Sequence, residues 1–176
     1  MKERTISVVM NGATGAVGGE VVNALTAMPD VERVTLLGRR AFDRVADPKI
    51  ASSVVDLEDP TSYASLLPGH EAAICTVGIG EPSKASKEEF VRIDKDLVLA
   101  FATACKQAGV RHFQMLGSVG ANAKSRSFYL RTKGELEDGL RDLEFERLSV
   151  FRPSMILTPT NRYGLSQAVT LAVWPR

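Results

Sequence analysis

The chain of 176 residues has little cysteine: only Cys75 and Cys105 occur, and they do not form a CxxC pair. This scarcity argues against a disulfide-stapled secreted domain and favours a reduced, cytoplasmic protein. Long apolar runs are also missing, because no stretch reaches the roughly eighteen residues that would predict a membrane-spanning helix. The first apolar run, in MKERTISVVMNGATG, is too short for a signal peptide and is soon broken by glycine.

An excess of one charge is lacking too. The net charge is +1 and the basic residues are dispersed, so nothing favours nucleic acid or an anionic membrane as a partner. His70 and His112 each precede an apolar run and have no second ligand at a metal-binding spacing, so we predict no metal site. What remains is the composition of an ordinary globular domain, with 44% hydrophobic and 24% charged residues.

Short apolar runs alternate with helical patterns along the chain. Helices are predicted over residues 17–27, 61–66 (weakly), 87–108 and 128–144, and strands over 5–10, 31–38, 52–57, 71–78, 111–118 and 147–153. This alternation predicts an α/β fold with right-handed crossovers: a doubly wound parallel sheet in the order 3-2-1-4-5-6, within a three-layer α/β/α sandwich of the Rossmann type.

We expect residues 1–176 to form a single domain of this type. After Pro153 the pattern predicts one more helix, over residues 165–174, which is apolar on most sides. Such a helix should be buried, yet little chain is left to cover it. We therefore expect the chain to be a fragment, or its C-terminal portion to be short or missing after about residue 157.

The stretch MNGATGAVGGEVV places glycines between the first strand and the first helix. They would permit a tight turn, close approach of the backbone to a pyrophosphate, and close packing of the helix on the strand. The spacing is GxxGxxG instead of the GxGxxG of the standard fingerprint, and no GxxxxGK[ST] phosphate loop occurs. The alternative is a turn that only connects two elements. The residues expected to contact a dinucleotide here are Gly12, Thr14, Gly15, Ala16, Val17 and Gly18.

The second strand ends in LLGRR, where an NAD-binding fold would place an acid for the ribose 2′-hydroxyl. Arg39 and Arg40 would instead suit a 2′-phosphate through bidentate hydrogen bonds, which favours NADP(H) over NAD(H). Two solvated arginines are the alternative. Asp56 either accepts a hydrogen bond from the adenine amino group or begins a loop, and both interpretations stay open. The remaining residues expected along the dinucleotide are Leu57, Thr76, Val77 and Gly78.

Tyr129 and Lys133 are four residues apart in FYLRTKGELEDGLRDLE, so on a helix they share one face. Leu136 and Leu140 continue the same apolar stripe. A buried, unpaired ammonium is costly, so either the first turn of this helix lies in solvent or the lysine faces a cleft where its charge is used.

Several of these segments together are similar to a known family. NGATGAVG, LGRR and VDLED, which follow the first three strands, resemble the short-chain dehydrogenase/reductase superfamily. FVRIDKDLVLAFATACKQAGVRHFQMLGSVGAN, FYLRTKGELE and RLSVFRPS resemble its atypical Tat-interacting-protein-like oxidoreductases, up to about Pro159. The resemblance implies a Rossmann sandwich with NADP at the glycine turn. Its catalytic set of Ser, Tyr and Lys falls on Ser118, Tyr129 and Lys133.

The resemblance also implies roles for these residues. In carbonyl reduction Tyr129 would donate the proton, Ser118 would hydrogen-bond the substrate oxygen, and Lys133 would favour the ionised phenol and hold the nicotinamide ribose. Pro153 and Ser154 would face the nicotinamide amide. The chain departs from the family in two ways: Asp94 lies where the family commonly has a proton-relay Asn, and most of the region that builds the substrate pocket is absent.

We consider two main hypotheses for the function of this chain. The first is an NADPH-dependent reductase of a small carbonyl compound, and the second is a non-catalytic NADP(H)-binding regulatory or interaction protein. Reduction of a nucleoside-sugar or flavin on the same scaffold is a third. By analogy with the superfamily, we expect any homodimer to form through the two long helices.

Overall fold

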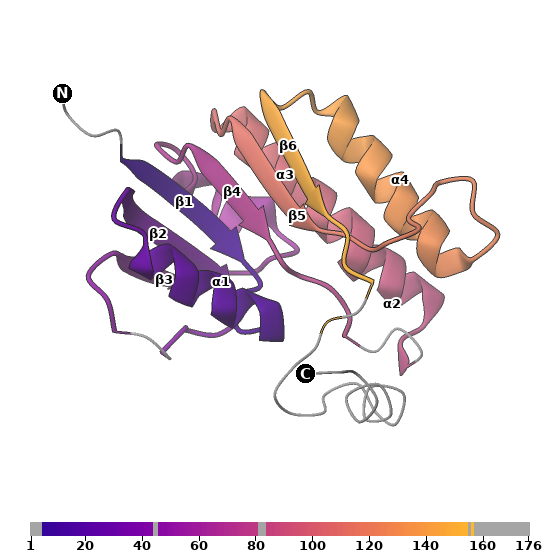
Figure 1. Ribbon diagram of the computed structural model, residues 1–176, viewed down its shortest axis with the longest axis horizontal. Helices are drawn as coiled ribbons and strands as arrows, with labels where there is room; N and C mark the ends of the chain where they lie inside the picture. The colour runs from indigo at the N-terminus through magenta and orange to yellow at the C-terminus, as the bar shows by residue number, and fades with distance from the viewer. Residues whose placement is uncertain (1–4, 44–45, 81–83, 155, 157–176) are drawn as a thin grey trace.

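The computed structural model describes residues 5–43, 46–80, 84–154 and 156. Within these ranges the strands form one parallel sheet in the order β3-β2-β1-β4-β5-β6, which confirms the predicted order and the Rossmann-like α/β fold (Figure 1). The strands are β1 (Ile6–Asn11), β2 (Val31–Gly38), β3 (Ile50–Val54), β4 (Ala72–Cys75), β5 (His112–Leu116) and β6 (Arg147–Phe151).

Helices pack on both faces of the sheet (Figure 1). Helix α1 (Ala16–Ala27) covers one face, where Val22 and Leu25 join a buried cluster with side chains of β1 and β2. On the opposite face a second cluster joins the sheet to α3 (Leu97–Gln107) and α4 (Phe128–Asp142). Helix α2 (Lys87–Val91) and the π-helical turn η4 (Arg92–Asp96) precede α3 along the chain. Apolar side chains on both faces of β1 and β4 are what a doubly covered parallel sheet requires.

The weak helix predicted over residues 61–66 is a pair of short 3₁₀ turns, η1 (Pro60–Ser62) and η2 (Ala64–Leu66). Tyr63 between them is fully buried, and its ring meets that of Phe101 edge-on at 6.0 Å. The helix predicted over residues 165–174 lies outside the described residues. None of the helices in the described part of the chain is long and apolar enough to cross a membrane.

The prediction for the third strand was wrong by several residues. We expected residues 52–57, but β3 spans Ile50–Val54. It is an edge strand with exposed side chains, so its own residues carry little apolar signal. Val55 and Leu57 misled the prediction because they pack into the core after the strand has ended. Asp56 between them begins a turn, in which its Oδ1 accepts the N–H of Glu58 at 2.9 Å.

The long helix predicted over residues 87–108 is present but not continuous. The π-helical turn η4 separates α2 from α3, and α3 ends at Gln107. π-turns insert a residue into a helix and often occur at functional sites. This one contains Asp94, a buried carboxylate that is 2% exposed.

His70 is the buried titratable side chain nearest the start of β4. One ring nitrogen donates to the Leu67 carbonyl at 2.9 Å, and the other accepts from the Thr35 hydroxyl at 2.8 Å. The Thr35 hydroxyl can donate to a neutral ring or accept from a protonated one, so burial and not a lost contact disfavours the charged ring. Burial, opposed by the Leu67 hydrogen bond, lowers the pKa of His70, and the charge of Arg33 lowers it further.

We therefore expect His70 to make the fold less stable in acid. The unfolded chain takes up a proton on this side chain more readily than the folded chain does, so stability is retained above about pH 6.5 and falls as the pH decreases below that value. Unfolding by urea between pH 5 and pH 8 should show this decrease, and His70→Gln should make it shallower. An unchanged slope in His70→Gln would contradict the assignment. His112→Gln is the control at a less buried histidine, whose pKa burial also lowers.

Candidate functional site

The turn after β1 is pressed against the end of β4. Gly12 has a φ of +83°, and a Cβ placed there would lie 2.5 Å from Oγ1 of Thr76 and 2.8 Å from the backbone nitrogen of Val77. Only glycine tolerates both the positive φ and the missing space. At the crevice between β1 and β4 the wall at Gly12 therefore consists of backbone atoms without a side chain.

Helix α1 begins directly after this turn. Its N-cap is Gly15, which has no side chain to occupy the first N–H groups. A Cβ on Gly18 would overlap the carbonyl oxygen of Gly12, so the helix rests directly on the turn. The GxxGxxG spacing is thus explained by packing. The N-terminus of α1 offers backbone donors and the positive end of a helix dipole to the space in front of it.

A cavity of about 260 Å³ lies at the carboxyl ends of the strands. The glycine turn, the end of β2, the loop after β3 and the end of β4 surround it. Most of the residues predicted to bind a dinucleotide line this cavity: Gly12, Thr14, Gly15, Arg39, Arg40, Asp56, Leu57, Thr76, Val77 and Gly78.

The other predicted residues lie elsewhere. Gly18 packs on Gly12, Ala16 opens α1, and Val17 lines a larger apolar groove on the α1 face of the sheet. Pro153 and Ser154 follow β6. Sequence reasoning missed several residues of the cavity wall: Ala13, Phe42, Ser52, Glu58, Glu89, Arg92 and Ile93.

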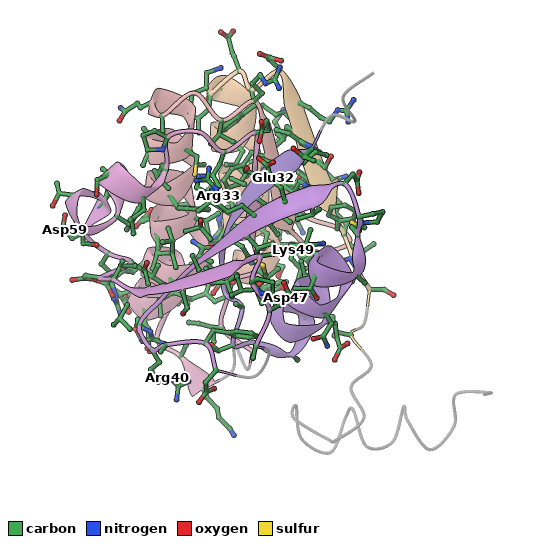
Figure 2. The ribbon with its side chains drawn as sticks, turned by 90° about the vertical axis from the view of Figure 1, so that its left-hand side faces the viewer. Glu32, Arg33, Arg40, Asp47, Lys49 and Asp59 are labelled. Carbon is green, nitrogen blue, oxygen red and sulfur yellow. The ribbon has the colours of Figure 1, made fainter. Side chains whose placement is uncertain are left out.

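Charged side chains border the cavity on two sides: after the end of β2, and on the side formed by η4. Arg39 and Arg40 are both exposed and line the cavity. In Figure 2, Glu32 and Arg33 mark the start of β2, and Arg40 lies beyond its other end. Across the cavity Arg92 of η4 pairs with Glu58, and this contact raises the pKa of the Arg92 guanidinium. The two partners are far apart in sequence, so no local pattern signals the pair.

The three predicted catalytic residues come from two elements. Ser118 follows β5, and the N–H of the next residue, Val119, donates to the Pro153 carbonyl at 3.1 Å. Tyr129 and Lys133 lie on α4, which begins after the N-cap Ser127. The ring of Tyr129 packs against Phe90 of α2, with ring centres 5.4 Å apart.

Lys133 is 5% exposed, and its ammonium has a specific partner. Its Nζ lies 2.7 Å from Oδ1 of Asp94, and a Cβ on Gly78 would lie 3.9 Å from Nζ. The lysine in the apolar stripe is thus a buried charge paired with Asp94, close to Gly78 of the cavity wall, and it does not itself line the cavity. Among the described residues, no group of three or more His, Cys, Asp or Glu side chains is placed to hold a metal ion.

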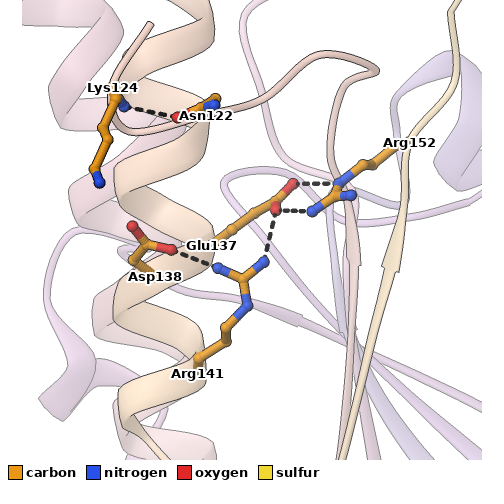
Figure 3. A network of polar contacts seen from close by, with 6 residues as sticks. All are labelled: Asn122, Lys124, Glu137, Asp138, Arg141 and Arg152. Carbon is orange, nitrogen blue, oxygen red and sulfur yellow. Dashed lines mark hydrogen bonds and ion pairs between the residues drawn. The ribbon is translucent and has the colours of Figure 1, made fainter.

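A second buried carboxylate ties α4 to the end of β6. Glu137 is 1% exposed, and both of its oxygens accept hydrogen bonds from Arg152, that from Nε at 2.9 Å (Figure 3). Arg141, one helical turn later, donates to the same carboxylate at 3.2 Å and also pairs with Asp138 on the surface (Figure 3). Because Arg152 precedes Pro153, this network fixes the loop that lies beside Ser118.

We expect Arg152→Met to destabilise the protein by about 2 kcal/mol or more, because the variant leaves the buried Glu137 with only one cation. Chemical denaturation would measure the change. Asp138→Asn is the matched control: it removes a surface partner of the neighbouring Arg141, and exposed pairs contribute about 0–1 kcal/mol. Equal effects of the two variants would contradict the role assigned to the buried network.

Comparison with known proteins agrees with this geometry. The family model described as NAD(P)H-binding matches residues 12–153, from the glycine turn to the loop after β6. The chain belongs to this NAD(P)H-binding family.

Individual relatives give a more specific comparison than the family model does. Protein HTATIP2 of Rattus norvegicus is 38% identical over 158 residues, which are 89% of this chain and 65% of that protein. This relative confirms the resemblance that the motifs indicated. Protein FMP52, mitochondrial, of Lodderomyces elongisporus is 32% identical over 164 residues, 88% of this chain and 68% of its own length. The chain thus spans about two thirds of the length of these relatives.

The expected cytoplasmic location is contradicted by the same comparison. Relatives from Emericella nidulans, Lodderomyces elongisporus and Candida albicans are all named as mitochondrial proteins. The prediction rested on cysteine content and on the lack of a signal-peptide pattern, and neither feature distinguishes one reducing compartment from another.

Solved structures of low sequence identity share the fold. The Bordetella bronchiseptica enzyme WbmG in complex with NAD superposes with a TM-score of 0.74 at 12% identity, over 97% of this chain and 61% of that one. MoeE5 in complex with UDP-glucose and NAD gives 0.68 at 19% identity, over 83% and 53%. These likenesses agree with the Rossmann-like α/β fold of this chain.

Proposed function

We propose that this chain binds NADP(H) in the cavity and is the nucleotide-binding part of a short-chain reductase that acts on a small carbonyl compound. The observation that carries the cofactor proposal is the wall of the cavity. One side is bare backbone with a helix N-terminus, and the other carries Arg39 and Arg40 with no acid at the end of β2.

The described residues fit a dinucleotide phosphate. Gly12 and Gly15 line the cavity at the turn that leads into α1, and the N–H groups and dipole at the N-terminus of this helix favour an anion such as a pyrophosphate. The two guanidiniums suit a 2′-phosphate, which they would bind through charge-assisted hydrogen bonds. Asp56 lines the cavity and also accepts a backbone N–H, so its turn-forming role and a contact to adenine are compatible.

We assign the chemistry to residues at the carboxyl ends of β4 and β5 and at the start of α4. A bound NADPH would supply the hydride to the carbonyl carbon. Tyr129 would donate its phenolic proton to the carbonyl oxygen, and Ser118 would hold that oxygen by a hydrogen bond. Lys133, buried beneath Gly78, would donate to the ribose on the nicotinamide side.

The cofactor preference is tested by replacing the two arginines. Arg39→Ala and Arg40→Ala should together weaken NADPH binding by about 10- to 100-fold and leave NADH binding unchanged, because each removes a charged donor that only the 2′-phosphate uses. Calorimetric titration measures both affinities. Arg147→Ala, at the amino end of β6, is a control remote from the cavity. If the affinities for NADPH and NADH decrease by the same factor, the arginines do not recognise the 2′-phosphate.

The reductase proposal is tested at Tyr129. Tyr129→Phe should lower NADPH-dependent turnover by about 100-fold or more with cofactor affinity unchanged, since a positioned proton donor typically contributes 10²–10⁴-fold. The assay follows NADPH oxidation with aldehydes, ketones and quinones. Tyr63→Phe is the control, because the buried Tyr63 hydroxyl has no hydrogen-bond partner within the described part of the chain, and burial raises its pKa to about 12. A wild type that binds NADPH and oxidises it with none of these compounds would favour the non-catalytic alternative.

A further inference from the structure

The carboxylate of Asp94 makes two contacts with two different elements. Its Oδ1 lies 2.7 Å from Nζ of Lys133 on α4, and its Oδ2 accepts the backbone N–H of Ile79 at 2.7 Å. Asp94 is 2% exposed and Lys133 is 5% exposed. Both carboxylate oxygens of Asp94 therefore have a hydrogen-bond donor, and both contacts are buried.

Only a carboxylate can make both contacts. An asparagine at this position has one carbonyl oxygen and one amide nitrogen, so one of the two donors would face a second donor. The presence of Asp at position 94 therefore has a structural reason here: one oxygen holds α4 and the other holds the loop after β4.

The pair lies directly beneath the cavity wall. A Cβ placed on Gly78, a residue that lines the cavity, would be 3.1 Å from Oδ1 of Asp94 and 3.9 Å from Nζ of Lys133. The π-helical turn η4 carries Asp94, while Ile93 from the same turn lines the cavity itself. The ammonium thus lies behind Gly78, while Arg39 and Arg40 line the same cavity from the end of β2.

We propose that Asp94 is a positioning residue that holds the Lys133 ammonium in place beneath Gly78, ready to bind the nicotinamide-side ribose. This inference rests on the proposed NADP(H) function and names the residue on which the position of the lysine depends. A buried ammonium without a partner is costly and would move toward solvent. Asp94 prevents this movement, because it supplies the opposite charge and a fixed hydrogen-bond acceptor.

Two ligands separate this role from general support of the fold. In the proposed binding mode NADPH would reach Lys133 through its nicotinamide-side ribose, whereas adenosine 2′,5′-bisphosphate has only the adenosine half and its 2′-phosphate. Asp94→Asn should weaken binding of NADPH by about tenfold or more, the effect of losing one charge-assisted hydrogen bond. Binding of adenosine 2′,5′-bisphosphate should change less than about twofold, because that ligand does not use Lys133. Calorimetric titration of both ligands gives the comparison.

The matched control is Asp96→Asn, which alters an exposed carboxylate in the same η4 segment and should leave both affinities unchanged. If Asp94→Asn unfolds too readily to be titrated, Lys133→Met and the double variant Asp94→Asn/Lys133→Met provide the test. The double variant lacks both buried charges. If Asp94 acts only through Lys133, it should bind NADPH as weakly as Lys133→Met does and no more weakly.

Each outcome has a definite meaning. Equal loss of both ligands in Asp94→Asn, or no loss of either, overturns the positioning role. A double variant that binds NADPH tenfold more weakly than Lys133→Met overturns it as well. A wild type that binds neither ligand overturns the proposed function itself, and this outcome is distinct because the wild-type titrations alone reveal it.

Discussion

The contact on which the rest of this structure depends is the one between Gly12 and the backbone of Thr76 and Val77. The ends of β1 and β4 approach so closely there that no side chain fits between them. In the sheet β1 has β2 as its neighbour on one side and β4 on the other. The connections that follow β1 and β4 therefore run in opposite directions from this point. This divergence opens the crevice in which doubly wound folds bind ligands.

Helix α4 is held to this crevice by two buried carboxylates. Asp94 reaches Lys133 near the start of the helix, and Glu137 joins the middle of the helix to Arg152 after β6. Buried ion pairs contribute uncertain net stability, but loss of one partner is costly, so they strongly favour a single arrangement. Tyr129 lies on the same helix, one turn before Lys133, and its ring packs against Phe90. The two pairs therefore fix the helix that carries the proposed proton donor.

Local features were predictable from the sequence, and features that join distant segments were not. The β2 strand and the glycine turn were located correctly, because their residues carry their own pattern. The edge strand β3 was misplaced, since its side chains are exposed while Val55 and Leu57 beyond it are not. The π-helical turn η4 and the pairs of Asp94 with Lys133 and of Glu58 with Arg92 depend on packing between separate elements. No residue spacing reveals them.

The central claim is that the cavity between the glycine turn and the two arginines binds a 2′-phosphorylated dinucleotide. The most direct test is a calorimetric titration of the wild-type chain with NADPH and, separately, with NADH. The account predicts that NADPH binds at least about tenfold more tightly, the effect of one charge-assisted contact to the 2′-phosphate. Equal affinities, or tighter binding of NADH, would contradict it.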